Sequence, residues 1–263
     1  MDLKLKNRVA MVAAASKGLG FGIARELARE GALLSICSRT EDDVISAAGE
    51  LEKMGGTKVL PVVADVSRPR AVKRWSKATF AKFGQVDILV VNAGGPPAGE
   101  FLDFEDSHWQ SAFELTLMSA VRLIRQVLPA MIERQTGSIL TVTSLSVKEP
   151  IDQLLLSNVF RAGVTGLVKT LSREIASHGI RVNNLIPGRM DTERLLALDQ
   201  LTAEREGLSL PDIRQREQER IPLGKYGSIE EFGRAAAFLV SPAASYITGT
   251  SLTVDGGILR TVW

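Results

Sequence analysis

Short apolar runs alternate with amphipathic stretches along the first two-thirds of the chain. Several amphipathic stretches end at a glycine with an apolar run directly after it, as at Gly31 and Gly84. Glycine just beyond a helix adopts the left-handed cap without a Cβ clash, and runs rich in Val, Ile and Leu are typical of strands buried on both faces. The pattern predicts strands at 8–14, 32–37, 58–63, 86–91, 138–143, 180–186 and 251–254, and helices near 19–30, 41–54, 69–83, 107–133, 153–177 and 228–240.

Strands and helices that alternate in this way indicate an α/β fold, a single doubly wound Rossmann-type parallel sheet with helices on both faces. Nothing resembling a linker divides residues 1–263, so we expect one domain. The segment 193–220 departs from the pattern because charged residues crowd it. A charge run is most often a solvated helix face, but long insertions beyond strand ends are also where lids lie. From its position we interpret 193–220 as a substrate lid.

Composition narrows the class of protein. The chain has 32 basic and 30 acidic residues, a balance too even for a protein that coats nucleic-acid phosphates. One cysteine, Cys37, excludes an intrachain disulfide, and with two histidines the chain is poor in metal ligands, so we expect no metal site.

The N-terminal residues allow a second interpretation. Lys4, Lys6 and Arg8 precede the apolar run 9–15, which is short for a signal peptide and continues directly into a turn and a helical pattern. No uninterrupted apolar run approaches the roughly 18–20 residues of a membrane helix. We therefore expect a cytoplasmic protein that acts on a small molecule, with neither a membrane nor a nucleic acid as partner.

The first candidate site is a glycine-rich turn. In a doubly wound sheet, ligands bind beyond the carboxyl ends of the strands. After the first predicted strand come Ser16, Lys17, Gly18, Leu19 and Gly20, which open a helix. Backbone N–H groups at such a turn can bind phosphate, although a simple tight turn has the same composition. The turn lacks the Gly-Lys-Ser/Thr ending of a P-loop.

The second predicted strand ends at Ser38 and Arg39, where an NAD-selective site usually has an acidic residue. Two cations, Lys17 and Arg39, favour the 2′-phosphate of NADP(H) over NAD. The alternative is that both are ordinary surface cations.

Further small or polar residues follow other predicted strands, and their order is informative. They are Asp65-Val66, Asn92-Ala93-Gly94, Arg181-Val182-Asn183, Pro187-Gly188 with Met190 and Thr192, Ile247-Thr248-Gly249, and Val254-Asp255-Gly256-Gly257. With these motifs the chain resembles a short-chain dehydrogenase/reductase, close to the 3-oxoacyl-carrier-protein reductase-like branch.

The resemblance implies a role for each matched position. Ser16 to Gly20 would hold the cofactor phosphates and Arg39 the 2′-phosphate. Asp65 and Val66 would flank the adenine, and Asn92, Ala93 and Gly94 would line the path to its ribose. The nicotinamide carboxamide would lie against Pro187, Gly188, Met190 and Thr192. The first turn glycine of the family is Ala14 here, which costs roughly 1 kcal/mol if the position needs a positive φ.

The catalytic positions differ from the family pattern. The family serine aligns with Ser144, but Ser157 stands where the proton-donating Tyr belongs and Arg161 where the Lys belongs. Arg161 would still bind the cofactor through a hydrogen bond to the nicotinamide ribose. The family Asn falls on Thr116, and Tyr226 and Tyr246 lie far downstream. A serine hydroxyl is a much weaker acid than a phenol, so the proton would come from a water held between Ser144, Ser157 and Arg161, or from Lys148 or His108 in a loop.

Two functions remain open at this point. The first is an NADP(H)-dependent oxidoreductase for a carbonyl or alcohol substrate with an atypical proton donor. The second is a catalytically silent nucleotide-binding subunit or sensor, since a retained fold does not guarantee retained chemistry. The resemblance also implies a homo-oligomer, a tetramer or dimer, built through the two long helices and the C-terminal strand region.

Overall fold

Seven parallel strands form one sheet in the structure, a computed structural model that describes residues 2–262. Their order is β3-β2-β1-β4-β5-β6-β7, so the direction of winding reverses between β1 and β4. Each predicted strand is present, and the predicted fold class is confirmed. The strands are β1 (Val9–Val12), β2 (Leu33–Ser38), β3 (Val59–Val63), β4 (Ile88–Val91), β5 (Gly137–Val142), β6 (Ile180–Pro187) and β7 (Ser251–Val254).

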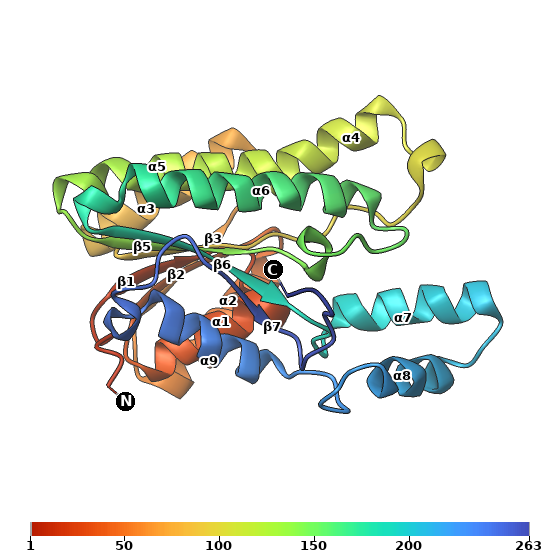
Figure 1. The fold of residues 1–263 in the computed structure, drawn as a ribbon. Coiled ribbons are helices and arrows are strands. Elements are labelled where there is room, and N and C mark those ends of the chain that lie inside the picture. The colour runs from red at the N-terminus through yellow and green to blue at the C-terminus, as the bar shows by residue number, and fades with distance from the viewer. Residues whose placement is uncertain (1, 263) are drawn as a thin grey trace.

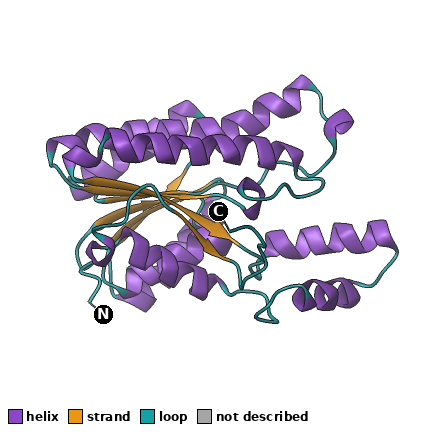
Figure 2. Ribbon diagram, viewed as in Figure 1, coloured by secondary structure: helices purple, strands orange, loops and turns teal. Residues whose placement is uncertain are grey.

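Helices cover both faces of the sheet, giving the three layers seen in Figures 1 and 2. Successive residues of β1 alternate between the layers: Ala10 and Val12 belong to one buried apolar cluster, and Met11 to the other. One face carries α1 (Gly18–Arg29), α2 (Glu41–Gly55) and α9 (Ile229–Val240), and the other carries α3 (Pro69–Phe83), α4 (Asp106–Phe113), α5 (Ser119–Glu133) and α6 (Leu155–Glu174).

The helix expected at 107–133 is two α-helices joined by a π-helical turn at Glu114–Met118. Within residues 2–262, Asp106–Glu133 is the one helical stretch long and apolar enough, by length and composition, to cross a membrane. The sequence has no uninterrupted apolar run here because Arg122 and Arg125 interrupt the pattern. Several of its apolar side chains, including Leu123 and Met131, are buried against the sheet, while others such as Leu128 are half-buried.

The single thiol lies in β2. Cys37 is fully buried, and burial raises its pKa to about 12, because the charged thiolate would lose its hydration. A thiol in this state is inert toward oxidation and metal binding.

The α1–α9 contact combines close backbone approach with a shielded ion pair. A Cβ on Gly22 would lie 2.4 Å from the Ile229 carbonyl oxygen, so only glycine allows this spacing. Arg25, buried on α1, pairs with Glu230 in the first turn of α9. The hydrogen bond from Arg25 lowers the pKa of Glu230 to about 2, with smaller contributions from its own N–H and the Ser228 hydroxyl.

This ion pair predicts an acid-sensitive contribution to stability. A carboxylate whose pKa is depressed by folding stabilises the protein above its ordinary pKa of 4.5, and that contribution is lost as the pH falls toward 2. Between those pH values the unfolding free energy of the wild type should fall by about 1 kcal/mol more than that of Glu230→Gln. This value is smaller than the full pKa shift would give, because the carboxylate is one-third exposed and solvent screens the pair. Urea unfolding at stepped pH measures the difference; parallel pH profiles for the two proteins would contradict the assignment.

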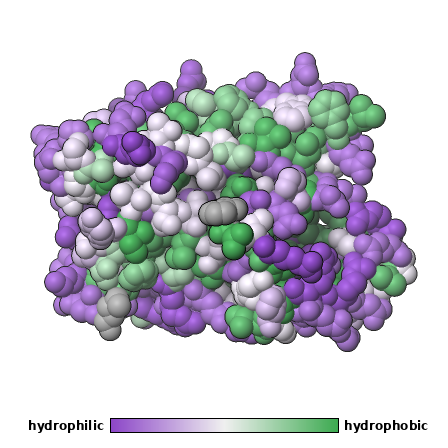
Figure 3. Space-filling view, viewed as in Figure 1, coloured by the Kyte–Doolittle hydropathy of each residue, from purple (hydrophilic) through white to green (hydrophobic). Residues whose placement is uncertain are grey.

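The charged segment 193–220 forms two helices, α7 (Glu193–Glu206) and α8 (Leu210–Glu219), which extend past the carboxyl end of the sheet (Figure 1). The surface over them is mainly hydrophilic (Figure 3). The sequence suggested a solvated charged face, but Asp199 on α7 and Glu217 on α8 are buried.

Candidate active site

A cavity of about 530 Å³ opens beyond the carboxyl ends of β1, β2, β4, β5 and β6. This is the edge of the sheet at which the winding reverses. Of the residues selected from the sequence, nearly all line this one cavity: Ser16, Lys17, Gly18, Leu19, Ser38, Arg39, Asp65, Val66, Asn92, Ala93, Gly94, Ser144, Ser157, Arg161, Pro187, Gly188, Met190 and Thr192. Gly20 and Thr116 do not line it.

The glycine-rich turn leaves the first N–H groups of α1 free to bind an anion. Lys17 is the N-cap residue, and its side chain makes no capping hydrogen bond. Gly18 has φ of +60°, and a Cβ on Gly20 would lie 2.3 Å from the Ala14 carbonyl oxygen. The Asn92 side-chain amide donates to the carbonyls of Ala13 and Ala14, at 3.2 Å each, and so holds the turn. Uncapped N–H groups and the helix dipole are suited to binding a pyrophosphate. Gly20 does not line the cavity, and its contribution is to let the helix pack closely against Ala14.

The substituted glycine of the turn keeps a left-handed backbone: Ala14 has φ of +49°. We expect Ala14→Gly to raise the unfolding free energy by about 0.5 kcal/mol, because the cost of a Cβ in this region exceeds the entropy that glycine adds to the unfolded chain. Thermal or urea unfolding would show this. Ala13→Gly is the matched control; the residue is buried without a positive φ, so its substitution should destabilise. Equal losses in both variants would contradict the strain argument.

Cations line the end of the cavity beside β2. The Lys17 ammonium lies 2.7 Å from the Glu193 carboxylate at the start of α7, and this hydrogen bond raises the pKa of Lys17. Arg39 has no ion-pair partner among residues 2–262. Its guanidinium is therefore available to a ligand.

The loop after β6 is packed tightly against the loop after β7. A Cβ on Gly188 would lie 2.4 Å from Asp255 Cα, which excludes any larger residue without backbone movement. Thr192 ends the loop and caps α7, its hydroxyl accepting from the Leu195 N–H at 3.3 Å. The positions implied for the nicotinamide thus lie on a fixed backbone.

At the other end of the cavity, Ser157 and Arg161 are one turn apart on α6. Arg161 Nε donates to Ser157 Oγ at 3.2 Å, and its Nη1 donates to the carbonyls of Val142 and Thr143 at 2.9 and 3.2 Å. Burial, with a smaller contribution from the charge of Arg194, lowers the pKa of Arg161 to about 10. The guanidinium therefore stays protonated at neutral pH.

Ser144 follows β5 and reaches the same part of the cavity. Its hydroxyl oxygen accepts from the Ser146 N–H at 3.2 Å. The hydroxyl proton remains free to be donated into the cavity.

Thr116 lies beside the cavity but not in its lining. It is buried in the π-helical turn, and its hydroxyl has no hydrogen-bond partner within the described chain. The neighbouring Leu115, not Thr116, reaches the cavity wall. Because a π-helical turn inserts extra residues into a helix, counting along the helix does not show which side chain faces the site.

Neither tyrosine lies at the cavity. Tyr226 donates to Asp199 Oδ2 at 2.9 Å, and burial together with this hydrogen bond raises its pKa to about 12. Tyr246 is fully exposed, and neither residue lines the cavity. Lys148, and His108 on α4, are also absent from its lining.

Sequence reasoning missed Arg194, which reaches the cavity from the first turn of α7. Its Nη2 donates to the Pro96 carbonyl at 3.0 Å, and a Cβ on Gly95 would approach that nitrogen to 3.1 Å. In the sequence, the only indication was Gly95, whose lack of a side chain leaves room for another group beside this loop.

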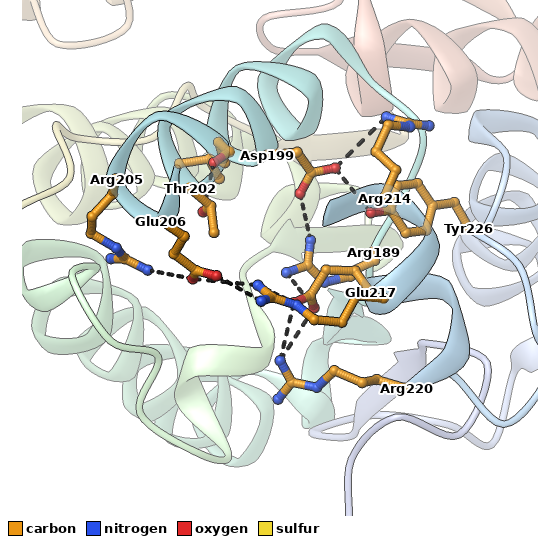
Figure 4. A network of polar contacts seen from close by, with 11 residues as sticks. Arg189, Asp199, Thr202, Arg205, Glu206, Arg214, Glu217, Arg220 and Tyr226 are labelled. Atoms are coloured by element: carbon orange, nitrogen blue, oxygen red, sulfur yellow. Dashed lines mark hydrogen bonds and ion pairs between the residues drawn. The ribbon is translucent and has the colours of Figure 1, made fainter. Parts of the chain in front are cut away.

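A buried ionic network holds α7 and α8 to the loop after β6 (Figure 4). Arg189 lies between the cavity residues Gly188 and Met190, and its guanidinium bridges Asp199 at 2.8 Å and Glu217 at 2.7 Å. Arg214 packs over the ring of Tyr226, 4.6 Å from its centroid. The two helices are thus anchored through groups that adjoin the site.

Comparison with known proteins identifies the family. A family model described as enoyl-(acyl carrier protein) reductase matches residues 13–259. The 3-oxoacyl-acyl-carrier-protein reductase FabG of Chlamydia muridarum is 33% identical over 258 residues, which cover 98% of this chain and 100% of that protein. The chain belongs to the short-chain dehydrogenase/reductase family.

Two further similarities extend over nearly all of this dehydrogenase/reductase. Dehydrogenase/reductase SDR family member 4 of Bos taurus is 33% identical over 97% of this chain and 88% of its own. L-sorbose reductase from Gluconobacter frateurii, solved with NADPH and L-sorbose, is 32% identical with a TM-score of 0.95 over 100% of both chains. The resemblance drawn from the sequence motifs is confirmed, and the protein is an oxidoreductase of the short-chain type.

Proposed function

We propose that this protein is an NADP(H)-dependent oxidoreductase that interconverts a carbonyl and an alcohol through an atypical proton donor. The observation that carries the proposal is the single cavity that contains both the uncapped start of α1 and the Ser144, Ser157 and Arg161 cluster. NADPH in the similar L-sorbose reductase supports the choice of cofactor.

The residues present fit the dinucleotide. The pyrophosphate would be held by the N–H groups of Ser16 to Gly20, the 2′-phosphate by Arg39 and Lys17, and the carboxamide by the fixed loop from Pro187 to Thr192. When bound, the nicotinamide supplies or accepts a hydride. Asp65, Val66, Asn92, Ala93 and Gly94 would orient the adenosine half.

Side chains of the protein would position the proton that the substrate oxygen gains on reduction. Arg161 donates to Ser157 Oγ, so the Ser157 hydroxyl proton points away from the guanidinium and is free for a substrate oxygen or a bridging water. Ser144 offers a second hydroxyl donor. The permanent charge of Arg161 would stabilise a developing alkoxide, which offsets the weak acidity of serine, and a bridging water would return a proton from solvent to the serine. Thr116 is buried near this cluster, and we assign it no proton-transfer step.

The second candidate is a nucleotide-binding subunit or sensor without turnover. The sequence resemblance supports this candidate, because it aligns Ser157 and Arg161 with the family Tyr and Lys. In this case the cofactor-binding residues keep their roles, and Ser144, Ser157 and Arg161 transfer no proton.

Measurements of cofactor binding and of turnover distinguish the two candidate functions. NADPH at about 100 times its Kd should raise the unfolding free energy by roughly 2.7 kcal/mol, and absence of any shift with NADP(H) or NAD(H) rejects both. A panel of ketones and alcohols should then reveal turnover, with Ser144→Ala lowering kcat/KM by about 100-fold. Activity that appears only in Ser157→Tyr/Arg161→Lys would support the silent subunit.

We also propose a cytoplasmic homo-oligomer, a tetramer or dimer, with residues 193–220 acting as a substrate lid. Support for the oligomer comes from exposed apolar side chains near α4 and α6, including Phe101, Leu102 and Val159, where apolar surface gathers in Figure 3. Light scattering of the purified protein would give the oligomeric state.

A further inference from the structure

The substrate end of the cavity has an excess of positive charge. The ionisable side chains that line this end are Arg161, Glu193 and Arg194, and Glu193 is already paired with Lys17 at 2.7 Å. Among the residues that the structure describes, neither arginine has a carboxylate partner within 4.0 Å, whereas Arg189 and Arg214 of the neighbouring network each have two.

Both guanidiniums keep unused donors. An arginine has five N–H donors in a fixed fork. Within residues 2–262, the hydrogen bonds of Arg161 use Nε and one Nη, and those of Arg194 use one Nη, directed to the Pro96 carbonyl. A neutral substrate would leave both charges in one cavity without a counter-charge, where the charge of Arg194 disfavours that of Arg161.

Arg194 is held in position by two segments distant in sequence. It projects from the first turn of α7, and the missing side chain of Gly95 gives its guanidinium room beside the loop after β4. The surrounding cavity wall is apolar, formed by Leu115, Leu154, Leu195 and Leu198. A ligand that complements this arrangement has a short apolar body and one planar anionic group.

We infer that the substrate is an oxo acid, or the corresponding hydroxy acid, whose carboxylate is bound by Arg194 with Arg161 beside it. A carboxylate matches the guanidinium fork with two parallel hydrogen bonds and removes the charge excess. The inference rests on the proposed function and assigns Arg194 as its specificity-determining residue.

Calorimetry on the protein saturated with NADP+ tests the inference without requiring turnover. The probes are 2-oxopentanoate and 3-oxohexanoate, each compared with its methyl ester. At least one acid should bind roughly 10- to 100-fold more tightly than its ester, since hydrogen bonds to charged groups are worth that much. Arg194→Gln should remove the difference and leave NADP+ binding unchanged, while Arg194→Lys should keep part of it.

Arg205→Gln is the matched control, because it removes the same charge from the far end of α7, outside the cavity. It should leave acid binding unchanged. Equal affinity for acid and ester, equal losses in the Arg194 and Arg205 variants, or weaker NADP+ binding in Arg194→Gln would each overturn the inference. Failure of NADP+ to bind the wild type would instead reject the proposed function.

Discussion

Replacing Arg189 with leucine is expected to release α7 and α8 from the rest of the protein. Asp199 and Glu217 would each lose their shortest ion pair while remaining buried, with exposed side-chain fractions of 2% and 5%. Breaking a buried pair from one side costs about 3–5 kcal/mol, because the remaining charge has neither water nor a partner. Arg214 and Arg220 would still contact the two acids, so the lower value is expected.

The loss should be local. The sheet and its two apolar clusters do not depend on this network, so hydrogen exchange should accelerate in 193–220 and stay slow in the strands. Arg205→Leu is the control: it removes an exposed pair with Glu206 at the end of α7, has no ion pair with Asp199 or Glu217, and should change little. Unchanged exchange in Arg189→Leu, or the same acceleration in both variants, would show that the network does not anchor the helices.

Arg39→Ala is expected to weaken NADPH binding by roughly 10- to 100-fold and to leave NADH binding nearly unchanged, because only NADPH brings a phosphate to this position. Lys17 compensates only in part, since its ammonium is shared with Glu193. Fluorescence titration with each dinucleotide gives both dissociation constants.

A nearby cation provides the control for that substitution. Arg68, at the start of α3, lies outside the cavity lining, so Arg68→Ala should affect neither cofactor. If Arg39→Ala weakens both cofactors equally, the guanidinium contacts the shared adenosine half. If it weakens neither, the 2′-phosphate is bound elsewhere.

The strands and the cofactor end of the site were predictable because local chemistry determines them. Apolar runs follow the glycine caps Gly56 and Gly84, and both caps adopt the expected left-handed φ. Residues at the carboxyl ends of parallel strands necessarily meet at one edge, so Asp65 and Asn92 reach one cavity although 27 positions apart.

What the sequence did not reveal depends on tertiary contacts. In the segment 193–220, composition alone does not distinguish buried Asp199 from the exposed acids near it, since its burial depends on Arg189 approaching from another loop. The π-helical turn that withdraws Thr116 has no sequence signature. Arg194 enters the cavity only because α7 begins beside Gly95.

The buried thiol of Cys37 can report local opening of the protein around β2. With one cysteine in the chain, a thiol reagent modifies a single known atom, and that atom lies in the apolar cluster between the sheet and the helix layer of α3 and α5. Modification therefore requires this helix layer to separate from the sheet beside the cofactor cleft. The labelling rate measures how often the layer separates, and its slowing by a dinucleotide would report binding without a dye, a tag or a substrate.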